Sequence, residues 1–253
     1  MIDVMRPKQD IRAEQEFFAG PMENFEPFDW RAKELLYSWL SRRSRPAADS
    51  LILDLAAGSG NFTKVLLARG HRVVGFDIAH NLIRTLRERT GLRRVFVGRA
   101  EELALDSDSF DVVTMCGVLH HFPDILPLLE EIHRVLKPGG SLFAIEPNLH
   151  NPWMFLFRSP SSPLYIPEGV TRNERPLSRR ELDTALARVF PRRLVEGICG
   201  VTFLKSGTAL DPLLPGFNLC SRLMGRFLPR SRWGEFLICS GWKESQPTRP
   251  GRI

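Results

Sequence analysis

The sequence predicts an α/β fold, a doubly wound and mostly parallel sheet with helices on both faces. Short aliphatic segments alternate along the middle of the chain with segments of helical periodicity, an order typical of parallel sheets. The short segments are rich in Val, Ile, Leu and Phe, as expected for strands that are buried on both faces. The 253 residues suit a single domain, expected at 1–245, with a polar, disordered tail at 246–253.

Seven segments are predicted to be strands. Five of them lie in the first part of the chain and two follow a long irregular region. The predicted strands are residues 50–55, 71–77, 93–98, 110–116, 141–146, 193–201 and 235–242.

Helices are predicted where apolar residues recur with a helical period. Ser178 followed by Glu181 is a capping box, so one helix should begin there. Another should end near Pro138, because proline cannot continue a helix and two glycines follow it. The predicted helices are residues 31–43, 61–70, 81–91, 124–140, 177–190 and 217–230.

The segments around the sheet are expected to differ in role. Residues 50–146 should form a cofactor-binding core, and residues 178–245 should complete the sheet. Residues 1–45 should form N-terminal lid helices. Residues 147–177 combine prolines and aromatics without a regular period, and long connections of this kind are usually lids or binding loops. We therefore expect an acceptor-side lid there.

Composition favours a cytoplasmic protein. The four cysteines lie far apart with no CxxC pair, so neither a disulfide framework nor a zinc site is expected. The N-terminus is too charged for a secretory signal, and no apolar run approaches the length of a membrane span. The formal charge of +6 admits nucleic acid, a membrane surface or an acidic substrate, but a solvated Arg-rich surface is the favoured interpretation.

A glycine-containing loop follows the first predicted strand in the stretch "LILDLAAGSGNF". Gly58 and Gly60 are not followed by the lysine of a P-loop, which argues against nucleotide triphosphate hydrolysis. Thr63 stands where a dinucleotide fingerprint has its third glycine, which weakens a pyrophosphate interpretation without excluding it.

Two acidic residues narrow the choice of ligand. Asp77 ends the second strand, where an acid can accept hydrogen bonds from both hydroxyls of a ribose. Asp54 stands just before the glycines, where a carboxylate would repel a pyrophosphate and attract an ammonium or a sulfonium. S-adenosylmethionine has both a ribose and a cationic amino-acid end. Alternatively, Asp54 caps the helix that follows.

These segments together resemble class I S-adenosylmethionine-dependent methyltransferases. "LDLAAGSG" is similar to their first motif and "VVGFDIAHNLI" to their second. "GRAEELALDSDSFDVVTMCGVLHHFPD" is similar to the segment that holds adenine, and "EIHRVLKPGGSLFAIEPN" to the helix, turn and fifth strand that follow. The resemblance covers about residues 51–148, with a weaker one in "LSRRELDTALARVF". It implies a seven-stranded sheet with the last strand antiparallel, and S-adenosylmethionine as the cofactor.

The resemblance also implies the residues of the donor site. Asp77 would hold the ribose, and Ile78 would pack against adenine. Ala56 stands where the family usually has glycine. Arg99 stands where many members have an Asp that pairs with the adenine amino group, so Glu101 or a backbone carbonyl would have to replace it. The full expected set is Asp54, Ala56, Gly58, Ser59, Gly60, Asp77, Ile78, Ala100, Glu101, Cys116 and Gly117.

Three residues near the ends of the fourth and fifth strands are candidates for catalysis. In-line methyl transfer needs mainly alignment, and a hydroxyl nucleophile also needs a base. His120 and His121 are the candidate bases, although one or both could only shape the loop, and His121 is more like a structural feature of the family. Glu146 is a second candidate, for orienting the substrate. No metal is expected, because no HxxxH or Cys/His cluster is present.

The expected reaction is methylation of O, N or C on a small, apolar or lipid-like acceptor. Aromatics in the two lid segments suit such a ligand, although lid packing accounts for many of them. The alternatives are a dehydrogenase of Rossmann type, an RNA methyltransferase and a non-catalytic S-adenosylmethionine-binding protein. Nucleic acid is disfavoured because the motif of base amino methylation is missing after the fourth strand. The aromatics are Phe18, Phe25, Phe28, Trp153, Phe155, Phe157 and Tyr165.

The segment 217–230 has two interpretations. Apolar residues lie there at helical spacing with arginines nearby, as in a basic interfacial helix that meets a membrane. The other interpretation is a helix docked on the core. The oligomeric state stays open. The residues concerned are Phe217, Cys220, Met224 and Phe227 with Arg222, Arg226 and Arg230.

Overall fold

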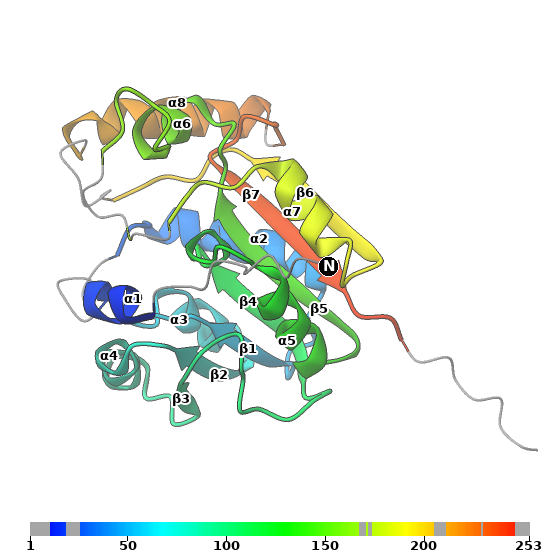
Figure 1. Ribbon diagram of the computed structural model, residues 1–253. Coiled ribbons are helices and arrows are strands. Elements are labelled where there is room, and N and C mark those ends of the chain that lie inside the picture. Colours follow the sequence, from blue (N-terminus) through cyan, green and yellow to red (C-terminus); the bar gives the residue numbers. More distant parts are fainter. Residues whose placement is uncertain are drawn as a thin grey trace, which may run out of the picture.

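The fold is a seven-stranded sheet between two layers of helices, seen in a computed structural model (Figure 1). The strands follow the order β3-β2-β1-β4-β5-β7-β6. Their bounds are Leu51–Leu55 (β1), Arg72–Asp77 (β2), Val95–Val97 (β3), Phe110–Cys116 (β4), Leu136–Pro147 (β5), Arg192–Ile198 (β6) and Phe236–Trp242 (β7). The structure describes residues 11–18, 26–166, 171, 174–204, 211–228 and 230–245, so the tail expected at 246–253 lies outside them.

The predicted strand directions are confirmed. The first five strands pair in parallel, and β7 pairs antiparallel with both of its neighbours, β5 and β6. The strand order reverses between β1 and β4. In open α/β sheets, ligands bind at the carboxyl ends of the strands beside such a reversal.

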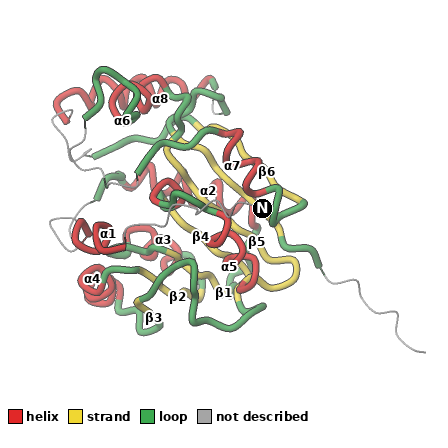
Figure 2. Tube along the Cα trace, viewed as in Figure 1, coloured by secondary structure: helices red, strands yellow, loops and turns green. Residues whose placement is uncertain are grey.

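Helices cover both faces of the sheet, as predicted (Figure 2). Leu36 and Trp39 of α2 and Leu66 of α3 belong to the buried cluster on one face. Ile132 of α5 and Leu186 of α7 belong to the cluster on the other face. The helices are Ile11–Phe18 (α1), Trp30–Ser44 (α2), Asn61–Ala68 (α3), His80–Thr90 (α4), Leu126–Val135 (α5), Pro152–Arg158 (α6), Arg179–Leu186 (α7) and Leu214–Phe227 (α8).

Two segments differ from the sequence prediction. The helix expected over 124–140 ends at Val135, and β5 begins at Leu136, because Leu136 already pairs with Phe110 before a bulge in the ladder. The loop expected over 147–177 contains α6. Asn151 caps that helix by accepting hydrogen bonds from the backbone N–H groups of Trp153 and Met154. An Asn followed by Pro at the first helical position is the local signal for such a start.

Helices α6 and α8 form a cap at the carboxyl ends of the parallel strands (Figure 1). They meet through aromatic rings, since the ring centroids of Trp153 and Phe217 lie 5.3 Å apart. The cap lies over the carboxyl ends of β1 and β4, where the strand order reverses (Figure 1).

The capping box at Ser178 and Glu181, predicted for α7, is present.

Candidate functional site

A cavity of about 630 Å³ opens at the carboxyl ends of β1, β2 and β4, under the cap. One end is polar and is lined by the loops after β1 and β2, including Asp54, Gly58 and Asp77. The other end is lined mostly by aromatic rings from α1, α6, α8 and the chain between them. The turn after β4 lies between the two ends. A polar ligand at one end and an apolar ligand at the other would therefore meet beside this turn.

The loop after β1 has a left-handed backbone at three positions. Ala56 has φ = 54° and Gly58 has φ = 54°, and both line the cavity. Ala56 therefore adopts this left-handed conformation, in which its Cβ atom lies close to the following carbonyl oxygen and destabilises the turn. Gly60, with φ = 86°, does not line the cavity. A Cβ there would lie 3.1 Å from Leu86, so Gly60 lets α3 begin close against α4. Its expected place at the ligand stays a prediction.

Asp77 holds the glycine loop in shape. Its carboxylate accepts hydrogen bonds from the backbone N–H of Gly58 at 2.8 Å and of Ala79 at 2.9 Å. Burial raises its pKa, and these backbone hydrogen bonds oppose that rise. The carboxylate of β2 thus fixes the backbone of the β1 loop on the side that faces the cavity.

Asp54 is a buried acid at the end of β1, 3% exposed. It accepts a hydrogen bond of 2.5 Å from the hydroxyl of Thr63 in the first turn of α3, whereas the N-cap position itself is Gly60. Burial raises the pKa of Asp54 to about 7, and the charge of Asp77 adds to the rise. In the described part of the chain, no Lys, Arg or His forms an ion pair with Asp54 or Asp77.

The remaining residues expected at the donor lie around the same end of the cavity. Arg99 lies 3.4 Å from the Oε1 atom of Glu101, so this acid is partly engaged by the residue that replaces the usual Asp. Ser59 accepts a hydrogen bond of 2.9 Å from Arg89. The residues that line this end with them are Ala56, Ile78, Ala100, Cys116 and Gly117.

His120 lies in the short turn after β4, Leu119–His121, and faces the cavity. Its Nδ1 atom lies 2.8 Å from Oε2 of Glu146, and its Nε2 atom lies 3.9 Å from Oε1 of Glu174. Burial lowers the pKa of His120, but the hydrogen bond and charge of Glu146 and the charge of Glu174 outweigh it, so the pKa is raised. This arrangement makes His120 a stronger base and leaves Nε2 directed away from Glu146.

Glu146 lies behind His120 and does not line the cavity. It is fully buried, and it accepts backbone hydrogen bonds from Val118 (3.0 Å), Leu119 (2.8 Å) and His120 (3.2 Å) in addition to the imidazole contact. Both its oxygens face the turn, where they contact His120, and this geometry favours a role in positioning His120 over direct contact with a substrate. The expected role of Glu146 in orienting the substrate stays a prediction.

His121 faces α1 at the N-terminal end of the chain. Its Nδ1 atom lies 3.2 Å from Oε2 of Glu14 and 3.1 Å from the hydroxyl of Thr171. Thr171 also donates a hydrogen bond of 2.8 Å to Oε1 of Glu14, which is 2% exposed. Three segments far apart in the sequence thus meet at His121, which supports its interpretation as a structural residue.

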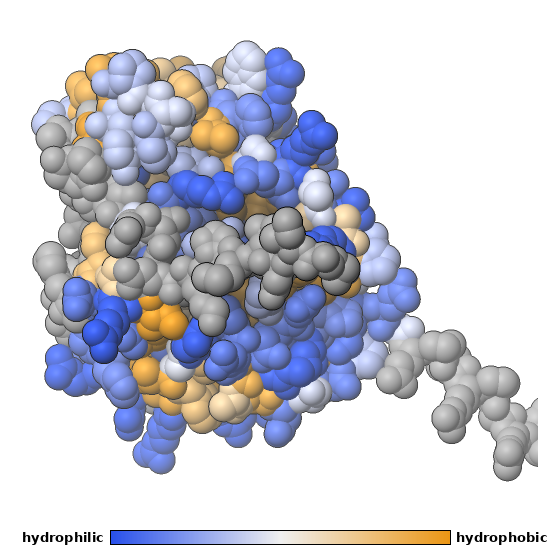
Figure 3. Space-filling model, in the orientation of Figure 1, coloured by the Kyte–Doolittle hydropathy of each residue, from blue (hydrophilic) through white to orange (hydrophobic). Residues whose placement is uncertain are grey.

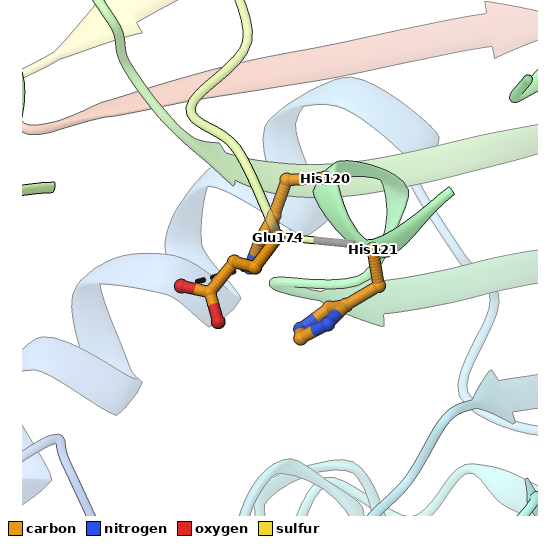
Figure 4. A group of neighbouring side chains, drawn as sticks. All are labelled: His120, His121 and Glu174. Carbon is orange, nitrogen blue, oxygen red and sulfur yellow. Dashed lines mark ion pairs between the residues drawn. The ribbon is translucent and has the colours of Figure 1, made fainter. Parts of the chain in front are cut away.

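Glu174 completes a group with the two histidines (Figure 4). One nitrogen of each ring and a carboxylate oxygen lie within 4.8 Å of one another, a spacing that a metal ion could bridge. Glu174 also accepts a hydrogen bond of 3.0 Å from Arg158, and His120 is held by Glu146. Arg158 and Glu146 therefore already supply charges opposite to those of Glu174 and a protonated His120. The absence of a metal stays a prediction.

Cys116 ends β4 at the meeting point of the two ends of the cavity. Burial raises the pKa of its thiol far above the usual value, and the charges of Asp54 and Glu146 add to the effect. A thiol in these surroundings stays protonated at neutral pH, so Cys116 is a poor nucleophile.

The apolar end of the cavity combines expected and unexpected residues. Phe18, Phe28, Trp153 and Phe157 line it as expected. Phe155 is 43% exposed, and neither it nor Tyr165 belongs to the lining, whereas Phe25 lies outside the described residues. The lining residues that the sequence did not reveal include Phe17, Phe203, Phe217, Phe236, Leu214, Arg158, Glu174 and Glu14.

The missed residues have no motif of their own. Glu14, Arg158 and Glu174 reach the site only because α1, α6 and the following loop fold over the sheet. The one available signal was the mixture of aromatic and charged residues in the two lid segments.

Comparisons with known proteins agree on one kind of domain. The sequence profile of the family described as "Methyltransferase domain" matches residues 53–144. The chain is 36% identical to the demethylmenaquinone methyltransferase of Lactococcus lactis over 46% of this chain and 47% of that protein. It is 26% identical to the ubiquinone biosynthesis O-methyltransferase of Hydrogenovibrio crunogenus, over 70% of this chain and 73% of that protein. The matched regions span about half the length of the demethylmenaquinone methyltransferases.

Solved structures show the same fold. Phosphoethanolamine N-methyltransferase 2 of Haemonchus contortus, in complex with S-adenosyl-L-methionine, matches with a TM-score of 0.63 and 20% identity, over 93% of this chain and 57% of that one. A SAM-dependent methyltransferase of Archaeoglobus fulgidus matches with a TM-score of 0.56 and 18% identity, over 83% of this chain and 94% of that one.

Proposed function

We infer that this chain is a class I S-adenosylmethionine-dependent methyltransferase, and from that premise we propose that it is an enzyme that methylates a small, lipid-like acceptor. The acceptor we favour is a quinol with an apolar tail. The observation that carries the proposal is a single cavity whose acidic end suits a cationic donor and whose aromatic end suits an apolar ring.

The donor end fits S-adenosylmethionine by its charge. Asp54 and Asp77 are buried carboxylates without a cationic partner in the described part of the chain, and buried charges are normally paired. A ligand that brings a cation would supply the missing partner to Asp54. A Cβ at Gly58 would meet no atom within 4 Å, so backbone lies open to the ligand there. We propose the donor-site residues named from the sequence as the binding set.

When bound, S-adenosylmethionine supplies an electrophilic methyl group on a sulfonium. The residues of this chain then have two tasks. The walls of the cavity hold the acceptor in line with that methyl group, which by itself supplies much of the rate in such displacements. Where the acceptor atom is a hydroxyl oxygen, Nε2 of His120 takes its proton as the new O–CH₃ bond forms. Glu146 and Glu174 stabilise the resulting imidazolium.

The aromatic end and the relatives support this acceptor class. The relatives include demethylmenaquinone methyltransferases and a ubiquinone biosynthesis O-methyltransferase. Phe28, Trp153 and Phe217 offer ring faces on which the acceptor ring could stack. Arg158 lines the same cavity and could contact a polar substituent of that ring. The reduced quinol is the expected form, because its ring carbon and oxygens are nucleophilic.

Location and domain layout are part of the same proposal. We place the enzyme in the cytoplasm, as the four free cysteines suggest. No helix in the described ranges is long and apolar enough to cross a membrane. We propose one catalytic domain over 1–245, with residues 50–146 as the donor core, and a peripheral membrane contact through 217–230.

The test is ligand binding followed by turnover. S-adenosylhomocysteine should raise the melting temperature, whereas NAD should not. The protein should then transfer a labelled methyl group from S-adenosylmethionine to a short-tailed demethylmenaquinol dispersed in detergent. Binding of the donor without transfer to a panel of quinols and phenols would contradict the proposal that the protein is an enzyme. Stabilisation by NAD alone would contradict the whole proposal.

A further inference from the structure

Helix α8 has an apolar outer face. Leu219, Leu223 and Phe227 repeat every four residues, so they form one stripe along the helix. Their exposed fractions are 53%, 50% and 73%. We call this stripe the α8 outer face. A docked helix normally turns such a stripe toward the core, so its exposure requires an explanation.

The exposed apolar residues gather around that helix. Of the eleven large hydrophobic side chains that are exposed in the described part of the chain, nine lie between 155 and 233, in the cap and its connections. Figure 3 shows apolar surface at the end of the molecule that carries α6 and α8. The nine are Phe155, Leu164, Leu204, Leu213, Leu219, Leu223, Phe227, Leu228 and Trp233.

The same helix carries only positive charge. Arg222 and Arg226 are exposed one turn apart, next to the outer face, and neither forms an ion pair with a described residue. The helix contains no Asp or Glu. The guanidinium of Arg226 lies 5.9 Å from the ring centroid of Phe227. An apolar stripe flanked by arginines is the pattern of a helix that lies in the plane of an anionic lipid surface.

The inner side of α8 is fixed to the protein and forms part of the cavity. Ser221 is 2% exposed and donates a hydrogen bond of 2.9 Å to the backbone carbonyl of Val201. Asn218 exchanges two hydrogen bonds with the backbone of Phe203, at 2.9 and 2.7 Å. Leu214 and Phe217 line the apolar end of the cavity. The helix thus separates the cavity from the outer face by its own thickness.

We propose that α8 docks the enzyme on an anionic membrane surface, with its outer face among the lipids, so that a lipid-like acceptor passes from the bilayer beside α8 and α6 into the aromatic end of the cavity. This inference rests on the proposed acceptor class. A second copy of the chain fits the surface less well. In a symmetric dimer the two basic stripes would face each other with no acid on α8 to pair them.

The first experiment is vesicle flotation of the full chain. Wild-type protein should float with vesicles of phosphatidylcholine and phosphatidylglycerol and should float much less with phosphatidylcholine alone. The triple variant Leu219→Ser, Leu223→Ser, Phe227→Ser should lose at least about tenfold in partition. The double variant Arg222→Gln, Arg226→Gln should lose about fivefold for each arginine, and only on the anionic vesicles.

Matched controls separate docking from misfolding. Trp30 and Phe96 are 69% and 47% exposed. Phe96 lies on β3, the edge strand farthest from the other edge strand, β6. Trp30→Ser and Phe96→Ser should float like wild type. All variants should keep the S-adenosylhomocysteine-induced rise in melting temperature. A wild-type protein that stays unbound on both vesicle types, or a triple variant that floats normally, overturns the proposal. So does a wild-type dimer that the triple variant converts to monomer.

The acceptor arm distinguishes this inference from the proposed function. With a demethylmenaquinol embedded in anionic vesicles, the triple variant should show a KM at least about tenfold higher. With the same quinol in detergent micelles, its kcat/KM should match wild type. Equal kinetics in both media overturn the docking role and leave the enzyme assignment intact. Flotation without methyl transfer in either medium overturns the enzyme assignment and leaves the docking intact.

Discussion

At the scale of single residues, Asp54 links the donor site to pH. The carboxyl has an ordinary pKa of 3.8 and a pKa of about 7 in the fold, where burial disfavours its charge. The unfolded chain therefore releases this proton at a lower pH than the folded chain does. By linkage, the contribution of Asp54 to the free energy of unfolding falls as pH rises from about 4 to about 7, and is constant above that range.

Asp54→Asn separates stability from binding. Without ligand, the variant should lose less stability than wild type between pH 5 and pH 8, measured by urea unfolding. Donor binding should behave oppositely. Calorimetry should show that wild type binds S-adenosylmethionine more tightly as pH rises through 7, and that the variant binds roughly 10–100-fold more weakly at pH 8. Identical pH profiles of binding for the two proteins would show that Asp54 does not meet the cation.

His120 and Glu146 form the second residue-level prediction. For a hydroxyl acceptor, His120→Gln should lower kcat by about 10²–10⁴-fold without changing the affinity for S-adenosylhomocysteine. Glu146→Gln removes a charge that raises the pKa of His120, so the acidic limb of its kcat–pH profile should move to lower pH. An unmoved profile in a folded variant would show that Glu146 only supports the turn.

At the scale of elements, α1 closes the site from the N-terminal side. Glu14 is its buried anchor and contacts His121 and Thr171. Glu14→Gln keeps the size but removes the charge, so α1 should be held less firmly. We expect faster hydrogen exchange in 11–18 and a higher KM for the acceptor. Glu16→Gln, on the same helix and exposed, is the matched control. Equal exchange in the two variants would contradict the anchoring role.

The elements also show how far the sequence can be read. The strands and the helices α3, α4 and α7 follow from local patterns, since aliphatic runs, glycine stops and a capping box each act within a few residues. Their order then fixes the place of Asp54 and Asp77. Helix α6 was missed because prolines and aromatics obscure a seven-residue helix. The contact of Glu14 with Thr171 spans 157 positions, and no local pattern encodes such a distance. Glu146 was assigned to the correct sheet edge, but its direction depends on the turn that it binds.

At the scale of the whole molecule, the group of His120, His121 and Glu174 already has oppositely charged neighbours in the protein and needs no metal ion. His120, His121 and Glu174 have the spacing of a metal site, but Arg158 and Glu146 already contact members of the group. Extensive treatment with a chelator should therefore leave methyl transfer unchanged, within about twofold. The check is turnover before and after dialysis, with metal analysis of the protein. Loss of activity that zinc or manganese restores would reassign the three residues as ligands.

The position of β7 has a consequence for how the chain is made. This strand lies between β5 and β6, and β6 pairs with no other described strand. During translation, β6 emerges from the ribosome about forty residues before β7, as a strand whose backbone groups have no neighbour. The nascent protein therefore carries an incomplete sheet, with unpaired strand edges open to wrong pairing, until residue 242 has been released.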